Sequence, residues 1–439
     1  MGNLPNQTIT AQTITDIYAG LHAIGQIDSG YDRPAYSDVE TAAIRYIQGL
    51  ADQAGLSHYW DAAANLIIEL QGQEDRWVES GSHLDTVPGG GNYDGAAGVI
   101  AALSVLIYVK KSQLRPYKGL RLRVWRGEES ASFGVVSIGA RAIMGVLPNE
   151  AWEQMHNGQS LYAAMQAQGA DAKALRTGMQ GMTSAQQAVI SAYVELHIEQ
   201  GNVLEQSKKT IGVVTGIRGS IRSWVRLKGR FDHSGATPMG TEFRADVNLA
   251  MSYMQVRLHE LAQEYGGQDL VQTIGVVNLN TSVAQALPDL RFNAVSKVSG
   301  CGFFSHEIRS CSLTLMDAYM LRVKAIVATT AAEFGVEMAL ETFSRMVGIP
   351  ALDPLIQRTI ADQCMALNIP SIPLPSGAWH DAGVMAQTEC RDGRLIPVGM
   401  IFIPSHDGVS HSPQEWTSAA DIATGATVLL HTMLQLAAD

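Results

Sequence analysis

The sequence has few cysteines, few charged residues and no long apolar run. Its four cysteines, among 439 residues, are Cys301, Cys311, Cys364 and Cys390, and they form no CxxC pair. This argues against a secreted disulfide framework and favours free thiols in a reducing cytosol. The start of the chain is polar, unlike a signal peptide, and no segment approaches about 18 uninterrupted apolar residues. We therefore expect a cytoplasmic protein with no membrane partner.

Basic residues are also in the minority. The chain has 31 Lys and Arg against 42 Asp and Glu, which gives a net charge of −11 and a pI near 5.5. A nucleic-acid partner is therefore not expected, because it would require a basic face. The hydrophobic content of 46 % is typical of a globular protein, and the length favours two domains.

Apolar strands alternate with helices in the first part of the chain. We expect helices at 38–54 and 96–109 and strands at 65–70, 77–80, 120–125 and 193–197, followed near the end of the chain by helices at 353–367 and 418–437. This alternation predicts an α/β fold with a mostly parallel sheet, in which ligands bind at the carboxyl ends of the strands. We assign residues 1–214 and 348–439 to this catalytic domain.

The pattern of expected strands and helices changes near residue 216. We expect strands at 221–231, 270–279, 302–310, 312–315 and 336–343, with helices at 243–265 and 316–334. The order β-α-β-β-α-β predicts a ferredoxin-like α+β domain, inserted at 215–347.

Several potential metal ligands follow separate strands. His83, Asp85 and Asp94 lie in the Gly-rich segment GSHLDTVPGGGNYDGAAG, while Glu128 and Glu129, His197 and His411 lie further along the chain. Imidazole and carboxylate ligands suit a pair of divalent ions that share a water and one bridging carboxylate. We expect the ligands to be His83, Asp94, Glu129, His197 and His411, with Asp94 as the bridge.

Two acidic residues are expected to support this centre. Asp85 would orient His83 by a hydrogen bond. Adjacent residues of a strand point to opposite faces, so Glu128 and Glu129 would not both bind one metal, and Glu128 would be the general base. Each piece alone has an ordinary explanation, such as a solvated Glu-Glu pair or a surface-loop histidine. Their joint occurrence after separate strands favours the metal hypothesis.

Several segments of the chain together resemble a known family. The segments that carry the resemblance are GSHLDTVPGGGNYDGAAGV, WRGEESASFG, ELHIEQG, GRFDHSGATPM, FFSHEIRS, PSGAWHDAG and MIFIPSHDGVSHSPQE, which spread from residue 81 to 415. They are similar to the dinuclear metal amidohydrolases of the N-carbamoyl-L-amino acid hydrolase, allantoate amidohydrolase and β-ureidopropionase group, within the aminoacylase and carboxypeptidase metallopeptidase clan. The resemblance implies a mostly parallel-sheet metallohydrolase domain with an inserted lid and dimerisation domain, and a homodimer.

The resemblance also implies roles for individual residues. The metal ligands, the base Glu128 and the supporting Asp85 are the residues named above, and His233 would stabilise the tetrahedral intermediate. Substrate contacts would come from Gln200, His233, Asn293, Arg309 and Gly377. Arg309 suits a substrate carboxylate, because a guanidinium makes two parallel hydrogen bonds to it.

The reaction that the resemblance implies is hydrolysis of the carbamoyl group of an N-carbamoyl-L-amino acid or related ureide, giving an amino acid, ammonia and CO2. The cofactors would be two divalent ions per subunit, zinc being favoured over Mn, Co or Ni. One alternative is an N-acyl amino acid amidohydrolase or carboxypeptidase-like hydrolase with the same metals. A second alternative, a non-catalytic ligand-binding descendant, is disfavoured because the sequence retains every expected ligand and the base.

This chain departs from the family at Ser130–Ala131, at Glu307, in the loop after Met239 and around Asn293. All but the first departure fall in the inserted domain. They therefore bear on specificity more than on the metal chemistry.

Overall fold

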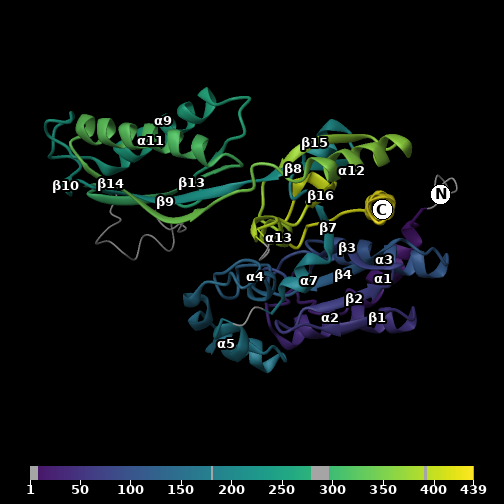
Figure 1. Ribbon diagram of the computed structural model, residues 1–439. Coiled ribbons are helices and arrows are strands. Elements are labelled where there is room, and N and C mark those ends of the chain that lie inside the picture. The colour runs from purple at the N-terminus through teal and green to yellow at the C-terminus, as the bar shows by residue number, and fades with distance from the viewer. Residues whose placement is uncertain (1–7, 179–180, 278–295, 390–392, 439) are drawn as a thin grey trace. The chain divides into compact units, whose positions relative to one another are not determined.

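The computed structural model of the chain describes all residues except 1–7, 179–180, 278–295, 390–392 and 439 (Figure 1). The described chain divides into two compact units, one made of residues 1–217 and 351–439 and the other of residues 218–350. The expected boundaries were 214 and 348. No helix among the described residues is both long and apolar enough to cross a membrane.

The first unit is built on one eight-stranded sheet. In sheet order its strands are β1 (Ser57–Trp60), β2 (Leu66–Leu70), β4 (Lys118–Trp125), β3 (Glu74–His83), β7 (Ile190–Ile198), β16 (Val398–Ile403), β8 (Ile211–Ile217) and β15 (Ser371–Ser376). The four central strands, β4, β3, β7 and β16, are parallel to one another, whereas β1–β2, β2–β4 and β16–β8 are antiparallel pairs. The fold is thus mixed α/β with a mainly parallel centre, as the alternation predicts.

Helices cover both faces of this sheet. The long ones are α1 (Ala11–Leu21), α2 (Asp38–Gln53), α3 (Ala96–Lys111), α12 (Pro354–Ala366) and α14 (Ala419–Leu436). The short elements are α4 (Ile138–Met144), η1 (Asn149–Glu153), β5 (Met155–His156), β6 (Gln159–Ser160), α5 (Leu161–Ala167), α6 (Ala172–Arg176), α7 (Ser184–Ala188), α8 (Val203–Ser207), α13 (Asp381–Gln387) and η3 (His406–Gly408).

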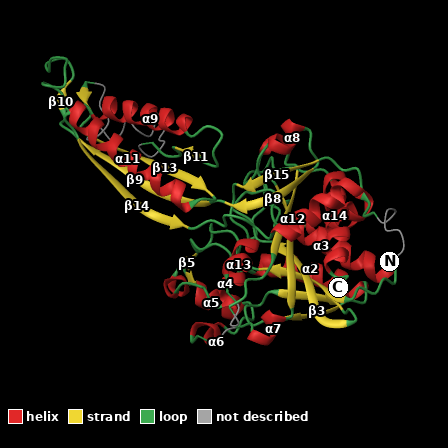
Figure 2. Ribbon diagram, turned by 45° about the horizontal axis from the view of Figure 1, so that its top comes forward, coloured by secondary structure: helices red, strands yellow, loops and turns green. Residues whose placement is uncertain are grey.

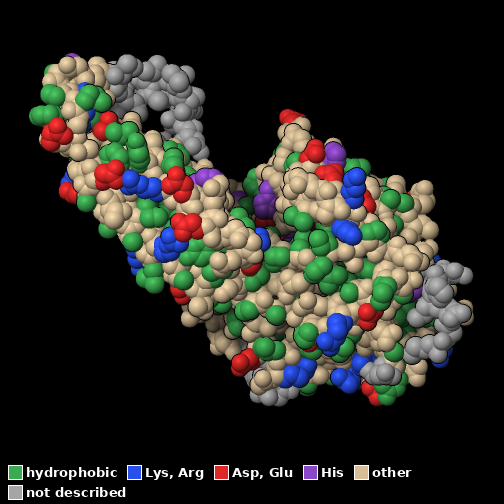
Figure 3. All heavy atoms as spheres, turned by 90° about the horizontal axis from the view of Figure 1, so that it is seen from above, with side chains coloured by type: hydrophobic (Ala, Val, Ile, Leu, Met, Phe, Trp, Pro, Cys, Tyr) green, Lys and Arg blue, Asp and Glu red, His purple; other side chains and the backbone are tan. Residues whose placement is uncertain are grey.

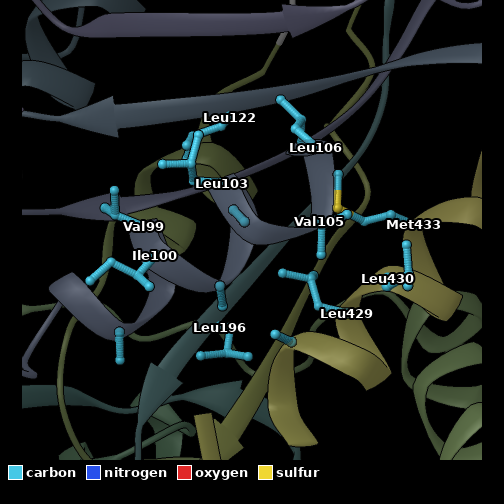
Figure 4. Packing of buried hydrophobic residues seen from close by; sticks show 14 of the residues in the cluster. Val99, Ile100, Leu103, Val105, Leu106, Leu122, Leu196, Leu429, Leu430 and Met433 are labelled. Atoms are coloured by element: carbon cyan, nitrogen blue, oxygen red, sulfur yellow. The ribbon is translucent and has the colours of Figure 1, made fainter. Parts of the chain in front are cut away.

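The core lies between the sheet, α3 and α14. Helix α3 is apolar on all sides, because it packs on β3 and β7 with one side and on α14 with another. Figure 4 shows Leu103 of α3 beside Leu122 of β4, and Val105 facing Leu429 of α14. Truncating such a buried leucine to alanine typically lowers the free energy of unfolding by about 2–5 kcal/mol. The packing of this layer therefore stabilises the central strands that carry the site.

Among its described residues, the second unit is an antiparallel sheet with helices on one face (Figure 2). Its elements are β9 (Gly219–Lys228), β10 (Asp232–His233), α9 (Val247–Glu264), β11 (Val271–Thr273), β12 (Lys297–Val298), β13 (Cys301–Ser310), α11 (Leu313–Phe334) and β14 (Glu337–Met346). The main sheet has the order β11-β13-β9-β14, and β10 pairs with β12. Apart from that small pair, the described elements follow the predicted order β-α-β-β-α-β.

Ion pairs join the two helices of this unit at the surface. Arg257 of α9 contacts Glu333 of α11 at 2.6 Å, and Arg322 of α11 contacts Glu264 of α9 at 2.6 Å. Figure 3 accordingly shows acidic and basic side chains side by side on the visible face of this unit.

One predicted strand is wrong, and other boundaries move. Residues 312–315 do not form a strand, because the hydroxyl of Ser312 accepts a hydrogen bond from Leu315 N and thereby caps the start of α11. Helix α9 begins four residues later than the predicted 243, where Asp246 caps it. Strand 270–279 is reduced to Val271–Thr273 among the described residues, and its last two positions lie outside them.

One buried histidine of the second unit predicts a pH-dependent stability. His306 of β13 is 1 % exposed and stacks on Tyr319, and neither ring nitrogen has a hydrogen-bond partner among the described residues. Burial lowers the pKa of His306 from 6.5 to about 4. The unfolded chain therefore binds this proton more readily than the folded one, and stability should fall as the pH drops from 6.5 towards 4.

Between pH 7 and pH 4.5 this one group should cost about 2–3 kcal/mol of unfolding free energy. His306→Phe should remove that loss, which urea unfolding of the metal-free protein at the two pH values would measure. His259→Gln, on the exposed face of α9, is the control and should leave the loss in place. An equal pH dependence of His306→Phe and the unsubstituted protein would contradict the assignment.

Candidate functional site

The expected ligands of the first unit meet at one edge of its sheet. His83 ends β3, Glu128 and Glu129 follow β4, and His197 is the last but one residue of β7. These strands are neighbours and parallel, so their carboxyl ends meet. Asp94 precedes α3, and His411 follows β16. The structure thus brings all five expected ligands together.

Asp94 joins two groups of possible ligands. Its carboxylate lies with His83 and His197 in one group and with Glu129 and His411 in another, and the ligand atoms of each group lie within 4.8 Å of one another. Oδ1 of Asp94 is 3.1 Å from His197 Nε2 and 3.5 Å from His83 Nε2, whereas Oδ2 is 3.2 Å from His411 Nε2. One carboxylate therefore faces three imidazoles, as a bridging ligand would.

In their neutral form, His83 and His197 present lone pairs, not protons, to this carboxylate. Nδ1 of His197 donates to the carbonyl of Ile198 at 2.9 Å, and Nδ1 of His83 donates to that of Asp85 at 3.1 Å. Each Nε2 atom is then an acceptor that faces another acceptor, and Oδ1 of Asp94 is buried with no hydrogen-bond partner among the described residues. A cation between these atoms would remove the mismatch, so the residues fit a divalent metal.

Charge in the site favours cations as well. Although burial opposes it, the imidazoles of His197, His411 and His83, when protonated, hold the pKa of Asp94 well below its usual range, so its carboxylate is charged. Hydrogen bonds to Asp94 and Glu129 raise the pKa of His411 to about 11. Once the imidazoles are neutral, as metal binding requires, the charge of the Asp94 carboxylate is no longer balanced by protonated histidines, and this favours a bound cation.

Asp85 holds the two acidic residues that follow β4. Its Oδ1 accepts from the N–H of Glu128 at 3.0 Å and its Oδ2 accepts from that of Glu129 at 2.9 Å. Oδ1 also lies 3.3 Å from Nδ1 of His83. The residue expected to orient His83 thus also orients the expected base.

Glu128 has the environment of a proton carrier. Burial raises the pKa of its carboxyl well above the usual range; the charge of Glu129 adds to the rise, and that of His83 opposes it. Its Oε1 accepts from the hydroxyl of Ser137 at 3.3 Å, and its Oε2 lies 4.0 Å from Nε2 of His83. A carboxyl with a raised pKa beside a metal site is suited to take up and return a proton near neutral pH.

The expected substrate contacts of the first unit lie near this cluster. Gln200 donates from Nε2 to Asp94 Oδ2 at 2.7 Å, while its buried Oε1 has no partner among the described residues. Gly377 follows β15, three residues before His380, whose ring lies 4.4 Å from that of His197.

The remaining expected residues belong to the second unit or lie outside the described residues. Nδ1 of His233 accepts from the N–H groups of Gly235 and Ala236 at 3.2 and 3.1 Å, so Nε2 carries its proton outward. Arg309 pairs with Glu307 at 3.1 Å. Asn293 lies outside the described residues.

Glu415 supports the site and was not predicted from the sequence. Glu415 accepts at Oε1 from the N–H of Asp94 at 3.0 Å and at Oε2 from that of His411 at 3.3 Å. It thus joins the loops of two expected ligands that lie far apart in the sequence. Two signals could have indicated it: its position four residues after His411, and its place in the segment MIFIPSHDGVSHSPQE, which carries the family resemblance.

Comparison with known proteins finds a family and relatives that cover most of the chain. The family model described as peptidase family M20/M25/M40 matches residues 80–435. An N-carbamoyl-L-amino acid amidohydrolase of Geobacillus stearothermophilus is 34 % identical over 418 residues, 94 % of this chain and 95 % of that protein. An allantoate amidohydrolase of Bacillus subtilis is 30 % identical over 97 % of each chain.

A solved structure has the same fold. A hydantoinase/carbamoylase family amidase from Burkholderia multivorans superposes with a TM-score of 0.87 at 26 % identity, covering 99 % of this chain and 100 % of that one. The family match and the relatives together span both units. The chain therefore belongs to peptidase family M20/M25/M40.

Proposed function

We propose that this chain is a metal-dependent amidohydrolase that cleaves the carbamoyl group of an N-carbamoyl-L-amino acid or related ureide, giving an amino acid, ammonia and CO2. The observation that carries the proposal is the Asp94 carboxylate, shared by two ligand groups, with the buried Glu128 beside one of them. Relatives named for carbamoyl and ureide substrates support this substrate class.

The residues present would hold two divalent ions. His83 and His197 would bind one ion, Glu129 and His411 the other, and Asp94 both. Mixed imidazole and carboxylate ligands favour zinc, with Mn, Co or Ni as alternatives. When bound, two such ions lower the pKa of a shared water and polarise a carbonyl.

The protein's own groups would then move the protons and place the substrate. Glu128 takes a proton from the attacking water and delivers it to the leaving nitrogen. Gln200 offers a buried amide oxygen to a substrate N–H. In the second unit, His233 offers an Nε2–H to the developing oxyanion and Arg309 a guanidinium to the substrate carboxylate. The lid role and the homodimer remain predictions.

Removing the general base should stop catalysis while leaving the metals bound. Glu128→Gln keeps the shape of the side chain but removes the proton carrier, so kcat should fall about 10²–10⁴-fold. Ammonia release and metal content of the same sample measure the two effects. If the variant kept more than a tenth of the kcat of the unsubstituted enzyme, Glu128 would not be the base.

The shared carboxylate should matter to both ions. The unsubstituted protein should bind about two ions per chain, His411→Ala about one, and Asp94→Asn fewer than one, because Asp94 would bind both. Elemental analysis after equilibration with zinc gives the counts. Equal counts for the two variants would show that Asp94 does not bridge.

A substrate panel separates the two candidate reactions. We expect kcat/KM for N-carbamoyl-L-amino acids or allantoate to exceed that for the matching N-acetyl amino acids by at least about tenfold, because a site that hydrogen-bonds a ureido N–H discriminates against a substrate lacking it. Ammonia is the readout for the first group and free amino acid for the second. A preference for N-acetyl substrates would instead indicate an aminoacylase.

A further inference from the structure

A segment outside the family match reaches both loops of the metal site. Residues 33–41 lie before residue 80, where that match begins. Two of the segment's charged side chains, Arg33 and Glu40, have no exposed surface. Buried charges require partners, and the partners of these two belong to the segments that carry the expected ligands and base.

Glu40 of α2 holds the turn that carries Glu128. Its Oε1 accepts from the N–H of Gly127 at 2.9 Å. Its Oε2 accepts from the backbone N–H of Tyr36 at 2.7 Å and from Nε of the buried Arg126 at 2.8 Å. Gly127 has a φ of +62°, a conformation that favours glycine. The chain therefore turns sharply at the residue whose N–H binds Glu40.

Two buried carboxylates therefore hold three successive backbone N–H groups. Gly127 donates to Glu40, and Glu128 and Glu129 donate to the two oxygens of Asp85. Asp85 approaches from the strand end that carries His83, and Glu40 from α2. This arrangement leaves the peptide of the expected base little freedom to shift.

Arg33 holds the other loop, which runs from His83 to Asp94. Its Nε donates to the carbonyl of Leu84 at 2.6 Å and its Nη1 to Oδ1 of Asn92 at 2.6 Å. Its backbone pairs with Thr86, donating to Oγ1 at 2.9 Å and accepting from the N–H at 3.0 Å. Both ends of this loop are thereby tied to one side chain.

An ordinary core ion pair is the alternative, and the chain contains one for comparison. Glu79 of β3 has no exposed surface and pairs with Arg121 at 3.1 Å and with Arg123 at 2.5 Å. It matches Glu40 in burial and in arginine pairing. It differs in that its hydrogen-bond partners are arginine side chains, whereas Glu40 also binds the backbone beside Glu128.

We propose that Glu40 and Arg33 are positioning residues for the two-metal centre, Glu40 fixing the turn of the general base and Arg33 fixing the loop between His83 and Asp94. The proposal rests on the function proposed above. Displacing a proton-transfer group by about 1 Å can cost 10²-fold in rate, so such supports affect catalysis without touching substrate.

The test compares Glu40→Gln with Glu79→Gln in the metal-loaded full-length protein. Glu40→Gln should lower kcat about 10–100-fold with KM and metal content unchanged, whereas Glu79→Gln should stay within about twofold of the unsubstituted enzyme. Both are assayed below their unfolding temperatures. Amide hydrogen exchange in a peptide covering 126–131 should become faster in Glu40→Gln and not in Glu79→Gln, a readout that requires no substrate.

Arg33→Lys should affect metal binding and not kcat, the reverse of what we expect for Glu40→Gln. Affinity for zinc, measured by competition with a chelator, should fall about 10–100-fold, while kcat at saturating zinc stays near that of the unsubstituted enzyme. If Glu40→Gln and Arg33→Lys lowered only the unfolding temperature, as we expect of Glu79→Gln, the proposal would be overturned. If the unsubstituted protein hydrolysed nothing but the exchange and zinc effects appeared, the proposed function would fail and the positioning roles would stand.

Discussion

The site depends on one buried negative charge, the carboxylate of Asp94. A carboxylate removed from water is costly unless charges and hydrogen bonds surround it. Here imidazoles face it from three separate segments, and Gln200 and Ser410 donate to its Oδ2 at 2.7 and 3.1 Å. Segments far apart in the sequence therefore have to meet at this point, and the metals would complete the compensation.

The parallel centre of the sheet makes that meeting geometrically simple. Strands β4, β3 and β7 are parallel and end at the same edge, so the residue that closes each strand arrives near its neighbours. Alternation along β7 then sends Leu196 into the core beside α3 and sends His197 to the opposite face, towards His380. A shift of one residue in that strand would exchange the two and abolish the site.

Residues whose types and spacing are unusual were predictable from the sequence, and residues whose role depends on tertiary contact were not. His83 and His197 stand at the ends of apolar strands, and Asp94 lies in a Gly-rich turn, so their chemistry is visible in the pattern. Arg33 lies in a polar stretch before the predicted helix 38–54, Glu40 lies in the first turn of that helix, and Glu415 ends a segment that resembles the family, but nothing in these patterns indicates a contact with the site. Only the folded chain shows their partners to be the segments that carry the expected ligands and base.

Dependence on a specific contact also explains why the predicted strand at 312–315 of the second unit was wrong. Ser312 follows a strand and precedes apolar residues, a pattern that suits either another strand or a helix cap. The hydroxyl decides for the cap, because it satisfies a backbone N–H that the first turn of α11 leaves unpaired.

Within the second unit, Arg309 is already committed to a partner. The carboxylate of Glu307 accepts from Arg222 at 2.6 Å and from Arg309 at 3.1 Å. Burial opposes it, but these hydrogen bonds lower the pKa of Glu307, so the carboxylate stays charged.

A substrate carboxylate would have to share Arg309 with Glu307. The bonds that Glu307 makes also fix the direction of the Arg309 guanidinium. Under the proposed function, recognition of the substrate carboxylate would therefore depend on this three-residue ion network of Glu307, Arg222 and Arg309. Substitutions at Glu307 would then change substrate preference and leave the contacts of Asp94, His83 and Glu128 within the first unit in place.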